Sequence, residues 1–239
     1  MISLPFEKRL GYVRDFYALL DELCVVAGGT RTLNAESARS KLPQRGVYFF
    51  FERSELRTHS GHSLRVVRVG THALKAGAQS TLWSRLRQHK GSMASGGGNH
   101  RCSIFRLIVG DALLARRGES HPTWGDGSNA PTDVKARELD LEREVSTVIR
   151  DMPFICLPVN DEAGPQSMRR AIERNAIALL SNVDRDAVDP PSNAWLGSWC
   201  RHGQAHKAGI WNSDHVDAAF EPGSLDIMSM LVAKMRREQ

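Results

Sequence analysis

The first 30 residues carry apolar side chains at the spacing of an amphipathic helix. Between Phe6 and Val26 they recur every three or four positions, which is the period of one helix face. Gly28 and Gly29 follow directly, and glycine is the usual residue just beyond a helix C-terminus. The pattern predicts a helix over residues 6–26.

Three later segments have the composition of strands. GVYFFFE at 46–52 is short and aromatic and carries apolar side chains on both faces, which is typical of a strand inside a covered sheet. LRVVRVG at 64–70 predicts the returning strand of a hairpin, with Leu64, Val66 and Arg68 on one face. MPFICLPV at 152–159 predicts a third strand.

Helical patterns occupy much of the remainder. TLWSRLRQH at 81–89 predicts a helix entered through a polar N-cap, and residues 166–182 predict an amphipathic helix. Residues 101–151 indicate a largely helical insertion, and a last helix is expected from Leu225. We expect the polar, glycine-rich stretch at 92–100 to be a flexible loop; it lacks the GK[ST] ending of a phosphate-binding P-loop.

These elements predict an α/β (α+β) domain: a small mixed or antiparallel sheet of about three strands, flanked by helices. We divide the chain into a helical N-terminal extension at 1–44, a central domain at 45–195 and a C-terminal extension at 196–239. The helical insertion interrupts the central domain at about 92–150. No internal repeat is visible.

Composition narrows the class of protein only slightly. The 239 residues carry a net charge of +5, which permits a polyanionic partner without requiring one. Four widely spaced cysteines indicate reduced thiols, and no apolar run approaches the ~20 residues that span a bilayer. We therefore expect a cytoplasmic protein with no membrane partner.

Several polar side chains stand where chemistry is possible, each with a structural alternative. Tyr48 lies on the strand face opposite Val47 and Phe49, where a core tyrosine bonded to the backbone is the commoner outcome. Arg85 and His89 are four residues apart on one helix face, a spacing that also suits a solvated basic surface.

Glu173 shares a helical stripe with Ile177 and Leu180, on the flank of an apolar face. Burying an ionised carboxylate against a hydrophobic core costs free energy unless a cation or hydrogen-bond donors compensate its charge. Arg169, one turn earlier, offers an ordinary ion pair as the structural alternative.

A cluster near the C-terminus offers a different site type. Cys200, His202 and His206 lie within seven residues, and His215 follows. Zinc sites use such groups, but a structural site normally shows two ligand pairs, and only one cysteine is present here. A zinc-stabilised interaction protein and a plain polar loop both stay open.

The order of these segments resembles the GIY-YIG nuclease domain: GVYFF, a strand ending in RVG, a helix of the form L-x-x-R-x-x-x-H, a later helix IERNAIALL, and an asparagine after a proline turn. The resemblance covers about residues 45–195. It implies a DNA endonuclease that uses Mg²⁺ or Mn²⁺ and is plausible in restriction, defence or repair. Cutting two strands with one small site often implies a homo-oligomer or repeated encounters.

The resemblance also implies roles for individual residues. Tyr48 matches the tyrosine that orients or deprotonates the attacking water, Arg85 the arginine that clamps the scissile phosphate, and His89 the position one turn later. Glu173 matches the single metal-binding glutamate, and Asn193 the asparagine that closes the site. These side chains are expected to converge on one cleft, and an acid on the far side of the sheet from the phenol would refute the hydrolase.

One departure separates the chain from the family pattern. Arg68 stands where the second motif has its name-giving tyrosine, and a permanent cation cannot act as a base. We expect Arg68, His72 and Arg87 to bind phosphate, and His72 is a second candidate for the lost hydroxyl's role. A catalytically impaired nucleic-acid-binding module of the same fold is therefore the alternative function.

Overall fold

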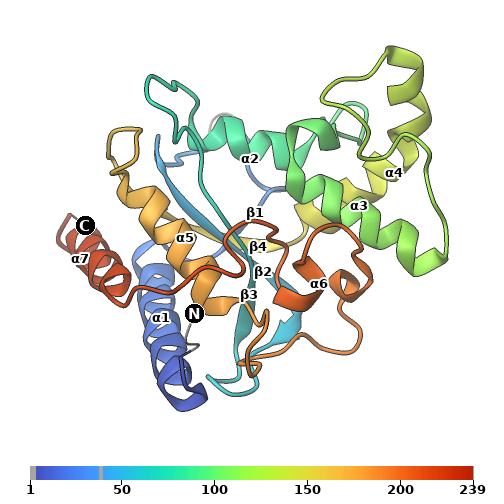
Figure 1. Cartoon of the computed structure of the whole chain (residues 1–239). Coiled ribbons are helices and arrows are strands. Elements are labelled where there is room, and N and C mark those ends of the chain that lie inside the picture. Colours follow the sequence, from blue (N-terminus) through green and yellow to red (C-terminus); the bar gives the residue numbers. More distant parts are fainter. Residues whose placement is uncertain (1–3, 38–39, 239) are drawn as a thin grey trace.

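The computed structural model describes residues 4–37 and 40–238, and it has three layers with a sheet between two groups of helices (Figure 1). The described strands run antiparallel to their neighbours in the order β1-β4-β2-β3. Their bounds are Arg31–Thr32 (β1), Gly46–Leu56 (β2), Leu64–Gly70 (β3) and Pro153–Pro158 (β4). The predicted fold class and its three strands are confirmed. The additional β1 is two residues long, too short to produce a periodic signal.

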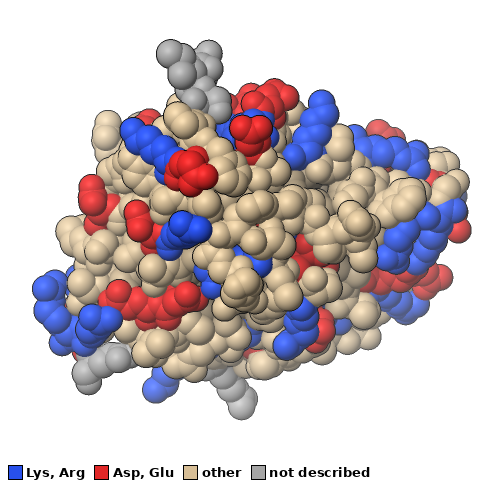
Figure 2. All heavy atoms as spheres, turned by 90° about the horizontal axis from the view of Figure 1, so that it is seen from below, with Lys and Arg blue, Asp and Glu red and all other residues tan. Residues whose placement is uncertain are grey.

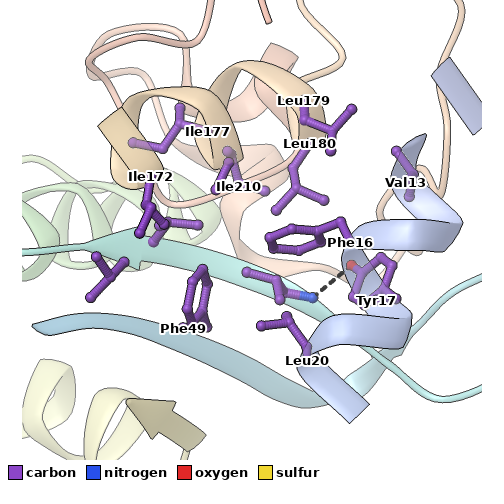
Figure 3. Packing of buried hydrophobic residues seen from close by; sticks show 14 of the residues in the cluster. Val13, Phe16, Tyr17, Leu20, Phe49, Ile172, Ile177, Leu179, Leu180 and Ile210 are labelled. Carbon is purple, nitrogen blue, oxygen red and sulfur yellow. Dashed lines mark hydrogen bonds between the residues drawn. The ribbon is translucent and has the colours of Figure 1, made fainter. Parts of the chain in front are cut away.

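Three helices cover one face of the sheet: α1 (Phe6–Val26), α5 (Met168–Leu180) and α7 (Gly223–Arg237). Figure 3 shows Phe16, Tyr17 and Leu20 of α1 packed toward Phe49 of β2 and the apolar side of α5. The Tyr17 hydroxyl accepts a hydrogen bond from the Val66 amide at 2.9 Å. Both predicted terminal extensions thus share a core with the sheet, and the division at residues 45 and 195 stays a prediction.

The other face is covered by α2 (Leu82–Lys90), by the inserted segment and by part of the C-terminal one. The helices of these two segments are η1 (His100–Cys102), α3 (Ile104–Arg117), α4 (Thr132–Arg150), η2 (Leu196–Trp199) and α6 (Ala205–Ala208). The loop at 92–100 packs against α3 and α4 at its glycines, and its flexibility stays a prediction. A Cβ on Gly97 would meet Leu139 at 2.7 Å, and one on Gly98 would meet Arg106 at 2.3 Å. A larger residue at either position would have to displace the Leu139 or Arg106 side chain, because the loop packs directly on the helices.

A β-bulge in β3 changes which face Arg68 occupies. Phe50 pairs with Arg68 and Phe51 pairs with Val66, so Val67 is the extra residue. Val66 belongs to the cluster under α1 and α5, whereas the Arg68 guanidinium lies 5.4 Å from the centre of the Phe105 ring on the opposite face. The prediction that Arg68 shares a face with Leu64 and Val66 is therefore wrong.

The outer edge of β3 is closed by a segment from the C-terminal part of the chain. The Trp211 amide donates to Val67 O at 2.6 Å. The Asn212 side chain accepts from the Val69 amide at 3.1 Å and donates to Val69 O at 2.9 Å. These contacts satisfy backbone groups that an open edge strand leaves exposed.

The surface seen from below carries Lys and Arg side chains interspersed with Asp and Glu, without one broad area of a single sign (Figure 2). No helix in the described part of the chain is both long enough and apolar enough to span a bilayer.

Candidate active site

Tyr48 and Gly70 form the first part of the site, because they lie opposite each other on β2 and β3. The phenol ring crosses directly over Gly70. A Cβ at that glycine would lie only 2.2 Å from the Tyr48 hydroxyl oxygen. The glycine that ends RVG thus leaves the space that the ring occupies. The hydroxyl reaches His89 Nε2 of α2 at 2.8 Å.

His89 is completely buried between the sheet and α3. Burial lowers the pKa of its imidazole well below the usual value, and the nearby cations Arg85, Arg68 and Arg106 lower it further. The ring is therefore neutral at pH 7, with one nitrogen lone pair available to accept a proton. The helix face that carries Arg85 and His89 is therefore not the solvated basic surface of the structural alternative, because His89 is buried and Arg85 is half-buried.

Glu173 reaches the same region from the opposite side of the sheet. Its helix α5 covers the face away from Tyr48, but its carboxylate lies at the end of β3, where Oε1 accepts from the Thr71 amide at 3.0 Å. Arg169 does not pair with it, because the Arg169 guanidinium is buried against Asp161. The acid thus extends around the sheet edge toward the phenol's side.

The Glu173 carboxyl has a raised pKa, with burial as the largest cause. Arg68, the Thr71 amide and Arg85 oppose this rise, while Asp214 adds to it. An ionised Glu173 therefore lacks full compensation from the protein and is improved by an added cation.

A cleft of about 370 Å³ opens at this edge, and Glu173, Arg85 and His72 all line it. Arg85 is half-buried and donates to Gln88 Oε1 at 2.9 Å and to Cys102 O at 3.2 Å. The remaining lining comes from the loop after β3 and from the first turns of α2: Thr71, Ala73, Leu74, Lys75, Ser80, Ser84 and Gln88. Tyr48 is fully buried and does not itself line the cleft. It packs against Gly70, the residue before the lining residue Thr71.

His72 is 6% exposed, and neither of its ring nitrogens makes a hydrogen bond of normal geometry to the described residues. Burial lowers its pKa to about 4, with Arg169, Arg45 and Arg85 acting in the same direction. A neutral imidazole offers phosphate one N–H and no charge. The backbone is fixed by Arg169, which donates to His72 O at 2.5 Å.

Arg68 is buried beneath the cleft and not at the surface. It donates to Trp211 O, and its Nε has no hydrogen-bond partner among the described residues. Burial lowers the pKa of its guanidinium, whereas Tyr48 and Glu173 favour the charged form. The cation that replaces the second-motif tyrosine thus lies among Tyr48, Arg85 and Glu173.

The structure does not bring Asn193 or Arg87 to the cleft. Asn193 is exposed, and the neighbouring Ser192 donates its amide and hydroxyl to Glu55 at 3.0 and 2.6 Å. Glu55 lies toward the far end of β2, roughly 23 Å from Tyr48 at ~3.3 Å per residue. Arg87 is exposed on α2 outside the cleft. Sequence reasoning missed Asn212, whose position beside Val69 depends on a contact across 143 residues.

The donors at the cleft fit one hard cation held largely through water. Glu173 is the only carboxylate that lines the cleft in the described chain, and only its Oε1 has a hydrogen bond from the protein. Mg²⁺ usually keeps several waters and binds one or two carboxylates. Over residues 4–37 and 40–238, no three His, Cys, Asp or Glu side chains gather as a metal-binding group, and this includes Cys200 with His202, His206 and His215.

Comparison with known proteins assigns the chain to a family. The GIY-YIG domain model matches residues 7–238, which includes both terminal segments as well as the central part. No match was found among curated proteins or among solved structures. Since the match extends over nearly the whole chain, the chain belongs to the GIY-YIG family of nuclease domains.

Proposed function

We propose that this chain is a divalent-metal-dependent DNA endonuclease that hydrolyses phosphodiester bonds. One observation carries the proposal: Glu173, Arg85 and His72 line a single cleft, beside the buried Tyr48–His89 pair. Hydrolysis needs a held water, neutralisation of the phosphate charge and help for the leaving oxygen. The cleft offers a candidate side chain for each.

Arg85 is assigned to the scissile phosphate. Its planar fork of donors matches phosphate oxygens, and its bonds to Gln88 and Cys102 O keep it oriented before DNA arrives. A preorganised cation of this kind lowers the barrier by about 2–4 kcal/mol. Arg68, beneath the cleft, adds positive charge without needing to reach the DNA.

The attacking water is assigned to His72 and Tyr48. His72 lines the cleft, and its two ring nitrogens are buried without a hydrogen-bond partner among the described residues, so the neutral ring is the candidate to accept a proton from a water that reaches it. Tyr48 acts from beside Gly70, with its own hydroxyl proton directed to His89. Asn212 anchors β3 next to Gly70 through its two hydrogen bonds to the Val69 backbone.

Glu173 is assigned as the metal ligand, with Mg²⁺ or Mn²⁺ as the ion. Such an ion, when bound, supplies positive charge to the phosphate and to the leaving 3′-oxygen. The Thr71 amide orients the carboxylate through Oε1 and leaves Oε2 for the ion or its waters.

The test is nicking of a supercoiled plasmid in Mg²⁺, in Mn²⁺ and in EDTA. Wild-type protein should nick with metal and not with EDTA. Glu173→Gln, which keeps size and hydrogen bonding, should lose cleavage while retaining DNA binding in a mobility-shift assay. Glu7→Gln removes an exposed carboxylate from α1 and should cut like wild type. Full metal-dependent cutting by Glu173→Gln would remove the assignment.

The second candidate is a nucleic-acid-binding module that does not cut. It is favoured by Arg68 in place of a hydroxyl and by the complete burial of Tyr48. DNA binding without nicking in either metal would select it. We further propose a cytoplasmic location, because the four cysteines are free thiols.

A further inference from the structure

Both ring nitrogens of His89 have side-chain partners. Nε2 lies 2.8 Å from the Tyr48 hydroxyl, and Nδ1 lies 2.7 Å from the Ser103 hydroxyl. Ser103 belongs to the inserted segment, at the junction of η1 and α3, and is only 2% exposed. The insertion therefore supplies a direct neighbour of the candidate active site.

The donor and acceptor directions follow from Arg68. Arg68 carries a positive charge and interacts electrostatically with Tyr48, so the phenol oxygen, the negative end of the hydroxyl dipole, faces the guanidinium. The hydroxyl hydrogen is then left for His89 Nε2. Because a neutral imidazole carries one hydrogen, that hydrogen is on Nδ1 and is donated to Ser103 Oγ.

Ser103 is itself held in place by its helix. It is the N-cap of α3, where its hydroxyl oxygen accepts from the Arg106 amide at 3.3 Å. The Arg106 side chain donates to His89 O at 2.8 Å and to Glu142 of α4 at 2.8 Å through Nε. The first turn of α3 thus fixes both the backbone and the ring of His89.

We propose that Ser103 is a positioning residue that holds the His89 imidazole as acceptor of the Tyr48 hydroxyl proton. This inference rests on the proposed nuclease function for its consequence, but its geometry is testable without DNA. It assigns the insertion a task at the active site, namely to set which nitrogen of His89 carries the hydrogen.

The first experiment is ¹H–¹⁵N NMR of the intact protein, with the His89 ring assigned by through-bond correlation to its own Cβ. The proposal expects a protonated Nδ1 and an unprotonated Nε2 at pH 7. Hydrogen on Nε2 in the wild-type protein would overturn it, whether or not the protein cuts DNA.

The second experiment compares Ser103→Gly with Ser146→Ala. Glycine keeps most of the N-cap's stability but removes the hydroxyl, while Ser146→Ala removes a buried hydroxyl that bonds Arg106 without touching His89. In Ser103→Gly we expect a mixed His89 tautomer and a single-turnover cleavage rate about tenfold lower, the equivalent of one lost hydrogen bond, with unchanged DNA affinity.

Ser146→Ala should keep both the tautomer and the rate. An unchanged tautomer and rate in Ser103→Gly would refute the positioning role. A wild-type protein that cuts no DNA with either metal would defeat the proposed function, and the NMR result would then still decide the hydrogen positions.

Discussion

Replacing Gly70 by alanine tests the packing of the Tyr48 phenol directly. The added Cβ would lie 2.2 Å from the hydroxyl oxygen and 2.4 Å from Cζ, whereas ordinary contact begins at 3.4 Å. The ring must therefore shift by about 1.2 Å, the difference between 3.4 and 2.2 Å. A shift of that size breaks the 2.8 Å bond to His89.

The expected cost combines two effects. Overpacking a core costs about 1–3 kcal/mol, and the lost hydrogen bond adds about 1 kcal/mol. At roughly 2–4 °C per kcal/mol for a chain of this size, Gly70→Ala should lower Tm by about 4–16 °C. Plasmid nicking should fall in parallel, because the phenol leaves its position beside the cleft.

Gly11→Ala is the matched control, since its Cβ meets nothing within 4 Å and α1 favours alanine. It should gain about 0.5–1 kcal/mol. Thermal unfolding by circular dichroism and a nicking assay at 25 °C measure both effects. A Gly70→Ala protein with wild-type Tm and wild-type cutting would refute the placement of the ring.

The remaining predictions concern charge and proton binding. Glu173→Gln should raise Tm at pH 7 without metal, because burial makes the ionised form costly, and the gain should shrink as pH falls through the raised pKa of the carboxyl. His72 has a pKa near 4 in the folded protein, so between pH 6.5 and 4 the unfolded chain binds more protons there than the folded one, and stability is lost as pH falls through about 6.5 to 4. His72→Gln should therefore flatten the plot of urea midpoint against pH over that window. An unchanged slope would contradict the burial of His72. Arg106→Met should cost about 3–5 kcal/mol in urea unfolding, since Glu142 loses a buried partner; a cost below about 1 kcal/mol would show that the ion pair is not buried as described.

Local patterns predicted the elements well, because helix and strand periods are written in neighbouring residues. The helix at 6–26 and the strands at 46–52 and 64–70 are present. The bulge at Val67 was not predictable, since Val66 and Val67 are both apolar and β-branched and hide the extra residue.

For the candidate site, the sequence predicted which helix or strand carries each residue, but not which residues meet in the folded chain. Tyr48 and His89 are 41 residues apart and meet because α2, which follows the β2–β3 hairpin, packs back on the sheet, and Glu173 reaches the same edge. The sequence named Asn193 and gave no sign of Asn212, because the hydrogen bonds of Ser192 to Glu55 and of Asn212 to Val69 are set by tertiary contacts. The N-cap role of Ser103 is local, but its contact with His89 requires α2 to pack on α3.

The closure of the β3 edge by Trp211 and Asn212 has a consequence for biosynthesis. Arg68 and Val69 leave the ribosome 143 residues before their partners. Until then the Val69 backbone groups and the Arg68 guanidinium have no such contacts, and the cation beneath the cleft is not anchored. A growing chain thus carries an unfinished candidate site, and the contacts of Arg68 and Val69 can form only after synthesis has passed Asn212.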